Sequence, residues 1–144
     1  MNVLPDTLMV PILLILGAAF GSFLNVVIYR VPKKMSVVSP GSHCFSCKEP
    51  IKIKDNIPVL GYFLLKGHCR NCNKSFPSRY AFVELITALL TICVYLIYGM
   101  GQDFFIYLAL TYLLIAITFV DIDHFIIPNG FVLIGLGILI VSLF

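Results

Sequence analysis

The chain has 144 residues, 60% of them hydrophobic and 12% charged, with a mean hydropathy of +1.00, which excludes an ordinary soluble domain. We expect instead an all-α polytopic membrane protein in contact with lipid. Nucleic acid is not expected as a partner despite the net charge of +3, because all 10 Lys and Arg residues lie between Arg30 and Arg79, in one segment flanked by apolar runs. The chain therefore divides into residues 1–29, 30–80 and 81–144.

The first segment contains the uncharged run Leu8–Ile28, which as a helix is long enough to cross a hydrocarbon core of about 30 Å. A cleaved signal peptide is disfavoured, because no cation precedes the run and Asp6 stands where a positive region is expected. The GxxxG pattern Gly17–Gly21 either lets another helix approach closely or is incidental. Asn25 lies inside the run, and because a buried amide in lipid requires a partner, we expect it to contact another helix.

The second segment, 30–80, is polar and carries two CxxC pairs, with a spacing just beyond that of zinc ribbons. Its cations predict a cytoplasmic location, where reducing conditions favour metal ligation over disulfides. We expect loop with a little strand or turn, stapled by a structural Zn²⁺ in a zinc-ribbon-like site of four cysteines; free or redox-active thiols are the alternative. The ligands are Cys44, Cys47, Cys69 and Cys72. His43 and His68 are interpreted as solvated loop residues, with substitution as ligands the alternative.

The apolar runs of the third segment, 81–144, predict further transmembrane helices. Glu84 interrupts the run Ala81–Tyr98, and it either reaches the interface, the favoured interpretation, or points into the bundle at a cation or ligand. After a turn without cations, Phe104–Val120 forms the next span. The last run, Phe131–Phe144, is about 21 Å long as a helix, which falls short of a crossing. We therefore expect about four transmembrane helices, the last incomplete, with the N-terminus outside and the cysteine loop in the cytoplasm.

Asp121 and Asp123 follow the third span. On a continuing helix their side chains point about 200° apart, so they cannot form a close pair. One interpretation is that both carboxylates cap the span at the interface. The other is that Asp121 is half of an acid/base pair, which needs one ionised and one protonated carboxylate, and no remaining apolar span supplies the second.

Five motifs occur in one order along the chain: GSFLNVVIYRVP at 21–32, the two CxxC pairs, NIP at 56–58, SRYAFVEL at 78–85, and VDIDH with IPN between 120 and 129. Together they resemble the type IV prepilin peptidases of the peptidase A24 family. These are bifunctional leader peptidases and N-methyltransferases of bacterial membranes. The resemblance covers essentially the whole chain.

The resemblance implies an intramembrane aspartic protease of the bacterial inner membrane. Such an enzyme removes the short basic leader of type IV prepilins or pseudopilins at the cytoplasmic face, in pilus assembly and type II secretion. It then methylates the new N-terminus with S-adenosylmethionine. Asp121 matches a catalytic aspartate, Asp123, Glu84 and Gly67 are candidate supporting residues, and the cysteine loop is associated with methyl transfer. His68 departs from the pattern, since relatives often have lysine there.

The second catalytic aspartate of the family lies in a downstream GxGD motif, which this sequence does not contain. We therefore expect the chain to be the N-terminal portion of such an enzyme and not to cleave prepilins without a GxGD-bearing partner, because one carboxylate cannot fill both roles. The alternative is a non-catalytic membrane zinc module that docks a peptidase half or a pilus or secretion assembly protein.

Overall fold

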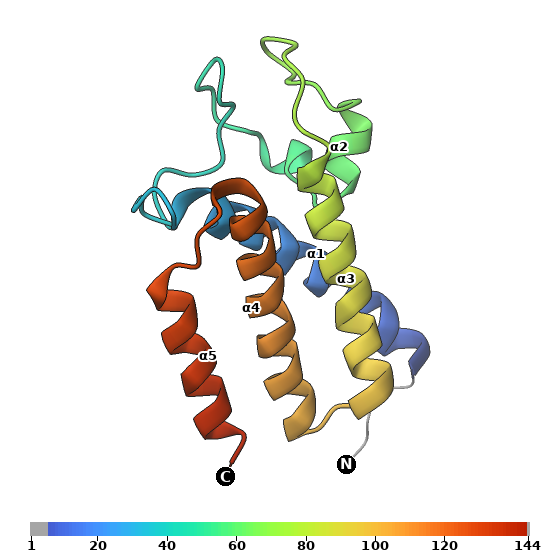
Figure 1. Ribbon diagram of the computed structural model, residues 1–144. Helices are drawn as coiled ribbons and strands as arrows, with labels where there is room; N and C mark the ends of the chain where they lie inside the picture. Colours follow the sequence, from blue (N-terminus) through green and yellow to red (C-terminus); the bar gives the residue numbers. More distant parts are fainter. Residues whose placement is uncertain (1–5, 144) are drawn as a thin grey trace.

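The computed structural model of the chain describes residues 6–143, which are mainly helical and form no extended strand (Figure 1). The elements are α1 (Asp6–Arg30), the 3-10 helix η1 (Ile53–Asp55), α2 (Leu60–Leu64), α3 (Arg79–Tyr98), α4 (Gln102–His124) and α5 (Asn129–Val141). Three stretches are long and apolar enough to cross a membrane, Thr7–Arg30, Arg79–Tyr98 and Gln102–His124, whereas α5 is shorter. The predicted all-α architecture, with a last helix too short for a full crossing, is confirmed.

Two helices extend past the ends that hydropathy predicts. α1 continues to Arg30, which is only 6% exposed because its guanidinium turns under the following loop. It donates hydrogen bonds to the carbonyl oxygens of Ser36, at 2.9 Å, and Pro40, at 2.7 Å. α4 runs on to His124, and Phe125 then ends it by taking a left-handed φ of 54°.

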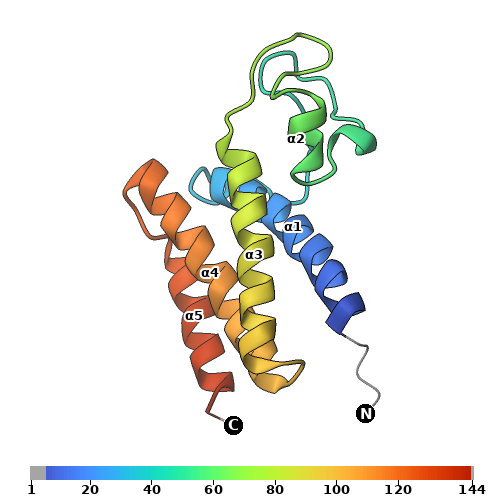
Figure 2. The same cartoon turned by 90° about the vertical axis from the view of Figure 1, so that its right-hand side faces the viewer.

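α1 and α3 cross at close range (Figure 2). A Cβ atom built on Gly17 would lie 2.6 Å from Thr91 Oγ1, and one built on Gly21 would lie 2.6 Å from the Cα of Glu84. Such separations are far shorter than a carbon contact, so only glycine lets the two backbones come this close. The GxxxG pattern is therefore a helix contact and not an incidental pair.

Two apolar clusters hold the helices together. The larger lies near the loop and joins α1, α3, α4 and α5 through Leu24, Ile28, Val83, Leu113, Ile115, Ala116, Val120 and Phe131. The smaller, at the opposite end, consists of Met9, Leu13, Val94, Tyr95 and Phe104. Many large apolar side chains on the outer faces of the helices are exposed, as a surface facing lipid requires.

Residues 31–78 lie above the ends of α1 and α3, and this layer is called the cysteine loop below (Figures 1 and 2). The apolar piece within it, expected as loop, strand or turn, folds instead as the short helix α2. α2 follows Val59, whose φ of 63° is rare for a β-branched residue. The N–H of Val59 donates a hydrogen bond to the Glu84 carboxylate of α3, 2.6 Å away. The residue with the rare φ therefore contacts a segment that is distant in the sequence.

Candidate functional site

The four predicted metal ligands come together in the cysteine loop. Their sulfur atoms all lie within 4.8 Å of one another, with 3.7 Å between Cys44 and Cys72 and 3.9 Å between Cys47 and Cys69. Four thiolates around a tetrahedral zinc at about 2.3 Å stand about 3.8 Å apart. The cysteines are not joined in disulfides. The arrangement could hold a metal ion, and its soft donors and spacing fit zinc.

The two CxxC pairs are built alike, and each forms what is called a knuckle below. In the first, the Cys44 N–H donates to Glu49 O at 2.9 Å, and Lys48 takes a φ of 62°. In the second, the Cys69 N–H donates to Lys74 O at 2.8 Å, and Asn73 takes a φ of 55°. The left-handed residue turns the chain directly after each pair, so both sulfurs of a knuckle face the same point.

The two thiols of the first knuckle differ in pKa, because, despite a backbone hydrogen bond from Glu49, burial and hydrogen bonds with the other cysteines raise the pKa of Cys47 to about 12. Hydrogen bonds from the backbone N–H groups of Cys47 and then Ser46 lower the pKa of the Cys44 thiol to about 6. A thiolate is the form that ligates a metal. Among the described residues, the cluster consists of the four cysteines and includes neither His43 nor His68. The Nδ1 atoms of these histidines pair with Gly41 O at 2.9 Å and Lys66 O at 2.6 Å.

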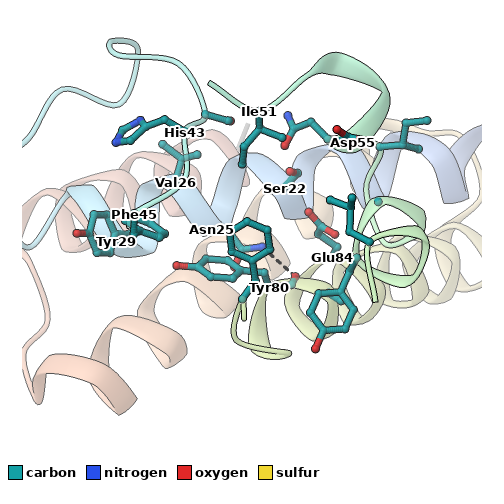
Figure 3. Close-up of a pocket in the computed structure, with 18 of the residues that line it drawn as sticks. Ser22, Asn25, Val26, Tyr29, His43, Phe45, Ile51, Asp55, Tyr80 and Glu84 are labelled. Carbon is teal, nitrogen blue, oxygen red and sulfur yellow. Dashed lines mark hydrogen bonds between the residues drawn. The ribbon is translucent and has the colours of Figure 1, made fainter. Parts of the chain in front are cut away.

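A cavity of about 240 Å³ lies between the cysteine loop and the loop-side ends of α1 and α3 (Figure 3). The sequence did not predict this cavity, although it suggested partners for two of the lining residues, Asn25 and Glu84. From α1 it is lined by Ser22, Asn25, Val26 and Tyr29, and from α3 by Tyr80, Ala81 and Glu84. The cysteine loop contributes His43, Phe45, Ile51, Asp55 and Tyr62, among others.

The polar groups of this cavity come from the two membrane helices. Asn25 donates from Nδ2 to Tyr80 O at 3.0 Å, which confirms the expected contact with another helix. Glu84 is half-buried and accepts hydrogen bonds from the Val59 N–H and the Ser22 hydroxyl. Its carboxylate therefore faces the cavity at the loop-side end of α3.

Aromatic rings form the wall at the other side of the cavity. The ring centroids of Tyr29 and Phe45 are 5.0 Å apart, and the rings of Phe45 and Tyr80 stack at 6.4 Å with an interplanar angle of 18°. Phe45 lies between the two cysteines of the first knuckle. The first pair of predicted metal ligands therefore flanks a residue of the cavity wall.

Asp121 and Asp123 lie in the last turn of α4, at the same end of the bundle as the cysteine loop but outside the cavity lining. The Asp123 carboxylate forms an ion pair with Arg79 of α3. Among residues 6–143, no hydrogen bond or ion pair engages the exposed Asp121 carboxylate. Glu84, Asp121 and the cysteines are thus near one end of the molecule but do not form one cluster.

Gly67 has a structural explanation. It takes a φ of 69°, and a Cβ atom there would lie 2.9 Å from Tyr62 Oη. Its N–H donates to Tyr62 O at 2.8 Å, and its carbonyl accepts from the Phe76 N–H at 2.6 Å. The glycine therefore forms the turn that leads into the second knuckle and keeps Tyr62 in the cavity wall.

Residues 15–98 match the family described as the bacterial peptidase A24 N-terminal domain. The chain belongs to this family. The match covers most of α1, the whole cysteine loop and α3, and therefore the four cysteines and the cavity, whereas Asp121 of α4 lies beyond it. No solved structure matches the chain.

Curated relatives of this A24-family chain are named for prepilin leader processing, and two of the three described here also for N-methyl transfer. A prepilin leader peptidase/N-methyltransferase of Myxococcus xanthus is 40% identical over 116 residues, which are 81% of this chain and 35% of the relative. A type 4 prepilin-like proteins leader peptide-processing enzyme of Escherichia coli is 37% identical over 80% of this chain and 49% of its own length. A prepilin leader peptidase/N-methyltransferase of Pseudomonas putida is 34% identical over 90% of this chain and 53% of its own length. The chain thus spans about a third to a half of these relatives.

Proposed function

We propose that this A24-family chain is the N-methyl-transfer part of a prepilin leader peptidase/N-methyltransferase of the bacterial inner membrane. The observation that carries the proposal is the cavity enclosed between the family-matched helices and the cysteine loop. The names of the relatives suggest type IV prepilins or pseudopilins as substrates, and S-adenosylmethionine is the proposed methyl donor. The 10 cations of residues 30–79 favour a cytoplasmic cysteine loop and an external N-terminus.

The proposed metal is a structural Zn²⁺ held by the four cysteines. A site with four thiolate ligands is closed, so the ion stabilises the fold and leaves no position open for a substrate. Each knuckle is too short to form a core of its own, and the metal joins the two. We therefore assign the cysteine site the task of holding Phe45 and its neighbours over the cavity.

Methyl transfer to an N-terminus has chemical requirements that this cavity suits. The nitrogen lone pair of a neutral amine forms the new N–C bond, the C–S bond of the sulfonium breaks with its electrons remaining on sulfur, and the amine releases one proton. Glu84 is a carboxylate that can accept a proton in a half-buried site. The rings of Tyr29, Phe45 and Tyr80 offer faces that attract a cation.

Leader cleavage is proposed to need Asp121 together with a second carboxylate that residues 6–143 do not bring to it. Asp123 projects in a different direction from the same helix and pairs with Arg79. Glu84 is bound to the Val59 N–H inside the cavity. A segment that bears a GxGD motif is the proposed source of the second aspartate.

The test uses the zinc-loaded chain in lipid nanodiscs with a leaderless pilin-like peptide and methyl-labelled S-adenosylmethionine. We expect mass spectrometry to find the label on the N-terminal amine. With a full prepilin, we expect no cleavage by the chain alone and cleavage once a GxGD-bearing segment is co-expressed, which Asp121→Asn then abolishes. Absence of methyl transfer with and without that segment would contradict the proposal and favour the non-catalytic docking module.

A further inference from the structure

The short helix α2 turns an apolar side outward, which is called the α2 face below. Leu60, Phe63 and Leu64 are spaced at i, i+3 and i+4, so they share one side of the helix, and they are 58%, 67% and 73% exposed. Ile53, in the adjacent η1, is 92% exposed as well. Single exposed apolar side chains are common, but a group of neighbours on one side of a helix marks a contact surface.

The opposite side of α2 is already occupied, so the helix cannot bury these residues by rotating. Gly61 packs against the backbone carbonyl of Asp55 in η1, where a Cβ atom would have no room. Tyr62 and Leu65 line the cavity. Among residues 6–143, the α2 face therefore stays exposed while the inner side of the helix is fixed in place.

The α2 face lies at the boundary of the membrane. The 20 residues of α3 are about 30 Å long as a helix, so its first turn reaches the edge of a hydrocarbon core of about 30 Å. The N–H of Val59, directly before α2, is 2.6 Å from the carboxylate of Glu84, in the second turn of α3. α2 thus starts beside a membrane helix, whereas the second knuckle stands farther from the helices (Figures 1 and 2).

The cations around α2 are free to contact an anionic partner. Lys52 precedes η1, Lys54 lies within it, and Lys66 follows α2. All three lysines are exposed, and none forms an ion pair among residues 6–143. Asp55, the acid of this stretch, is paired with Arg70. The surroundings of the α2 face therefore carry positive charge that the described residues leave uncompensated.

We propose that the α2 face rests in the headgroup region of an anionic bilayer and so anchors the cysteine loop to the membrane. Its three apolar side chains contact the outer part of the acyl chains, and the three lysines contact lipid phosphates. An apolar side flanked by lysines is typical of segments that lie in the membrane interface. Lipid fits better than a protein partner, because the face lies at the depth of the boundary and is surrounded by charge of one sign. The proposal is independent of methyl transfer, since it concerns contact with lipid.

Tryptophan can report the surroundings of the α2 face, because the sequence contains none. Phe63→Trp and Leu64→Trp each place one indole on the face, and Ser75→Trp places one beside the second knuckle as the control. The zinc-loaded full chain is reconstituted at one copy per nanodisc, in phosphatidylcholine and phosphatidylglycerol. For both α2 variants we expect a blue-shifted emission that brominated lipid quenches and that acrylamide, a neutral quencher in water, reaches poorly. Ser75→Trp should show the reverse, and circular dichroism verifies that each variant folds.

A second measurement tests the lysines. Bromine is carried either by the phosphatidylglycerol or by the phosphatidylcholine of otherwise identical nanodiscs, so the ratio of the two quenching constants gives the enrichment of anionic lipid around the indole. We expect about five-fold enrichment or more for Phe63→Trp, since one lysine near an anionic surface contributes about that factor. Combining Lys52→Gln, Lys54→Gln and Lys66→Gln should abolish it. Lys74→Gln, in the second knuckle, is the control and leaves it unchanged.

Each result decides the inference. If acrylamide reaches Phe63→Trp as readily as Ser75→Trp and brominated lipid quenches neither, the α2 face lies in water and the inference fails. If acrylamide is excluded but brominated lipid does not quench, protein covers the face and the inference fails as well. Equal quenching by the two brominated lipids overturns the assignment to anionic headgroups. Lipid quenching with an anionic enrichment that the three lysine substitutions remove supports it.

Discussion

The cavity has a floor and a roof that are stabilised by different forces. The floor, the loop-side ends of α1 and α3, depends on two glycines that let the helices meet and on apolar packing. The roof, residues 31–78, has little apolar core and depends on four cysteines, two similar turns and a few polar contacts. The contrast teaches that one cavity can combine a surface formed by membrane helix packing with one built around four cysteines that could hold a metal. The two should therefore fail under different treatments.

Metal removal should have the largest effect and should act on the roof alone. Zinc binding supplies about 10–16 kcal/mol in small zinc peptides, and the roof has no comparable substitute. We expect about one zinc per chain by plasma mass spectrometry, and none in Cys69→Ser. Limited proteolysis of the variant should then be fast within residues 31–78, while helical circular dichroism persists. Cys93→Ser, in α3, is the matched control, and a metal-free roof that resists proteolysis would contradict the contrast.

A glycine substitution should break the floor and leave the metal in place. In Gly21→Ala the new Cβ meets the α3 backbone at 2.6 Å, which is too close for either helix to accommodate without moving. We expect a loss of about 1–3 kcal/mol in the free energy of unfolding, measured by detergent denaturation. Gly137→Ala has nothing within 4 Å and should be neutral or slightly stabilising. If both variants unfold alike, close helix approach is not what stabilises the floor.

The ion pair between Arg79 and Asp123 joins the floor to the end of α4. Both side chains are about a quarter exposed, so the pair should contribute no more than about 1 kcal/mol. A double-mutant cycle with Arg79→Gln and Asp123→Asn measures this coupling energy. We expect a small positive coupling that shrinks in high salt. A coupling of zero would show that the first turn of α3 and the last turn of α4 are independent.

Acid should produce the smallest effect, and in the roof only. The hydrogen bond from Arg70 holds the pKa of the Asp55 carboxyl below its ordinary value of 3.8. A lowered pKa in the folded state means that this contribution is complete above pH 3.8 and is lost as the pH falls through the folded-state value. At pH 7 we expect amide hydrogens of the roof to exchange faster in Asp55→Asn than in the unmodified chain. The two rates should converge as the pH falls through the folded-state pKa of Asp55. A difference that stays constant with pH would exclude the carboxylate as its cause.

Hydropathy and cysteine spacing were enough to predict the long helices and the cluster of four cysteines, because both signals are local. A run such as Leu8–Ile28 has one stable conformation in lipid, and two CxxC pairs place thiolates by short turns. The close approach at Gly17–Gly21 was one of two interpretations, because whether a small residue faces another helix depends on packing. A sequence pattern alone does not show which face of a helix packs against a neighbour.

The cavity was beyond the reach of sequence reasoning for a different reason. The Glu84 carboxylate accepts a hydrogen bond from the N–H of Val59, and every residue has such a group except proline. No pattern of residue types therefore announces the contact. Phe45 lies in the cavity wall, and Arg30, counted from sequence among the cations that set topology, is buried against the carbonyl oxygens of Ser36 and Pro40. In each case the side chain acquires its role from a segment that is distant in the sequence.

The position of Phe45 between Cys44 and Cys47 links the two halves of the site thermodynamically. Any ligand that packs against this ring favours the conformation in which both neighbouring sulfurs face the metal. If zinc and such a ligand both bind, reciprocity requires that the ligand tighten zinc binding by the same factor by which zinc tightens the ligand. Ligand present in excess would slow zinc loss to a chelator, and a zinc-depleted cell would lose ligand binding before it lost the membrane helices.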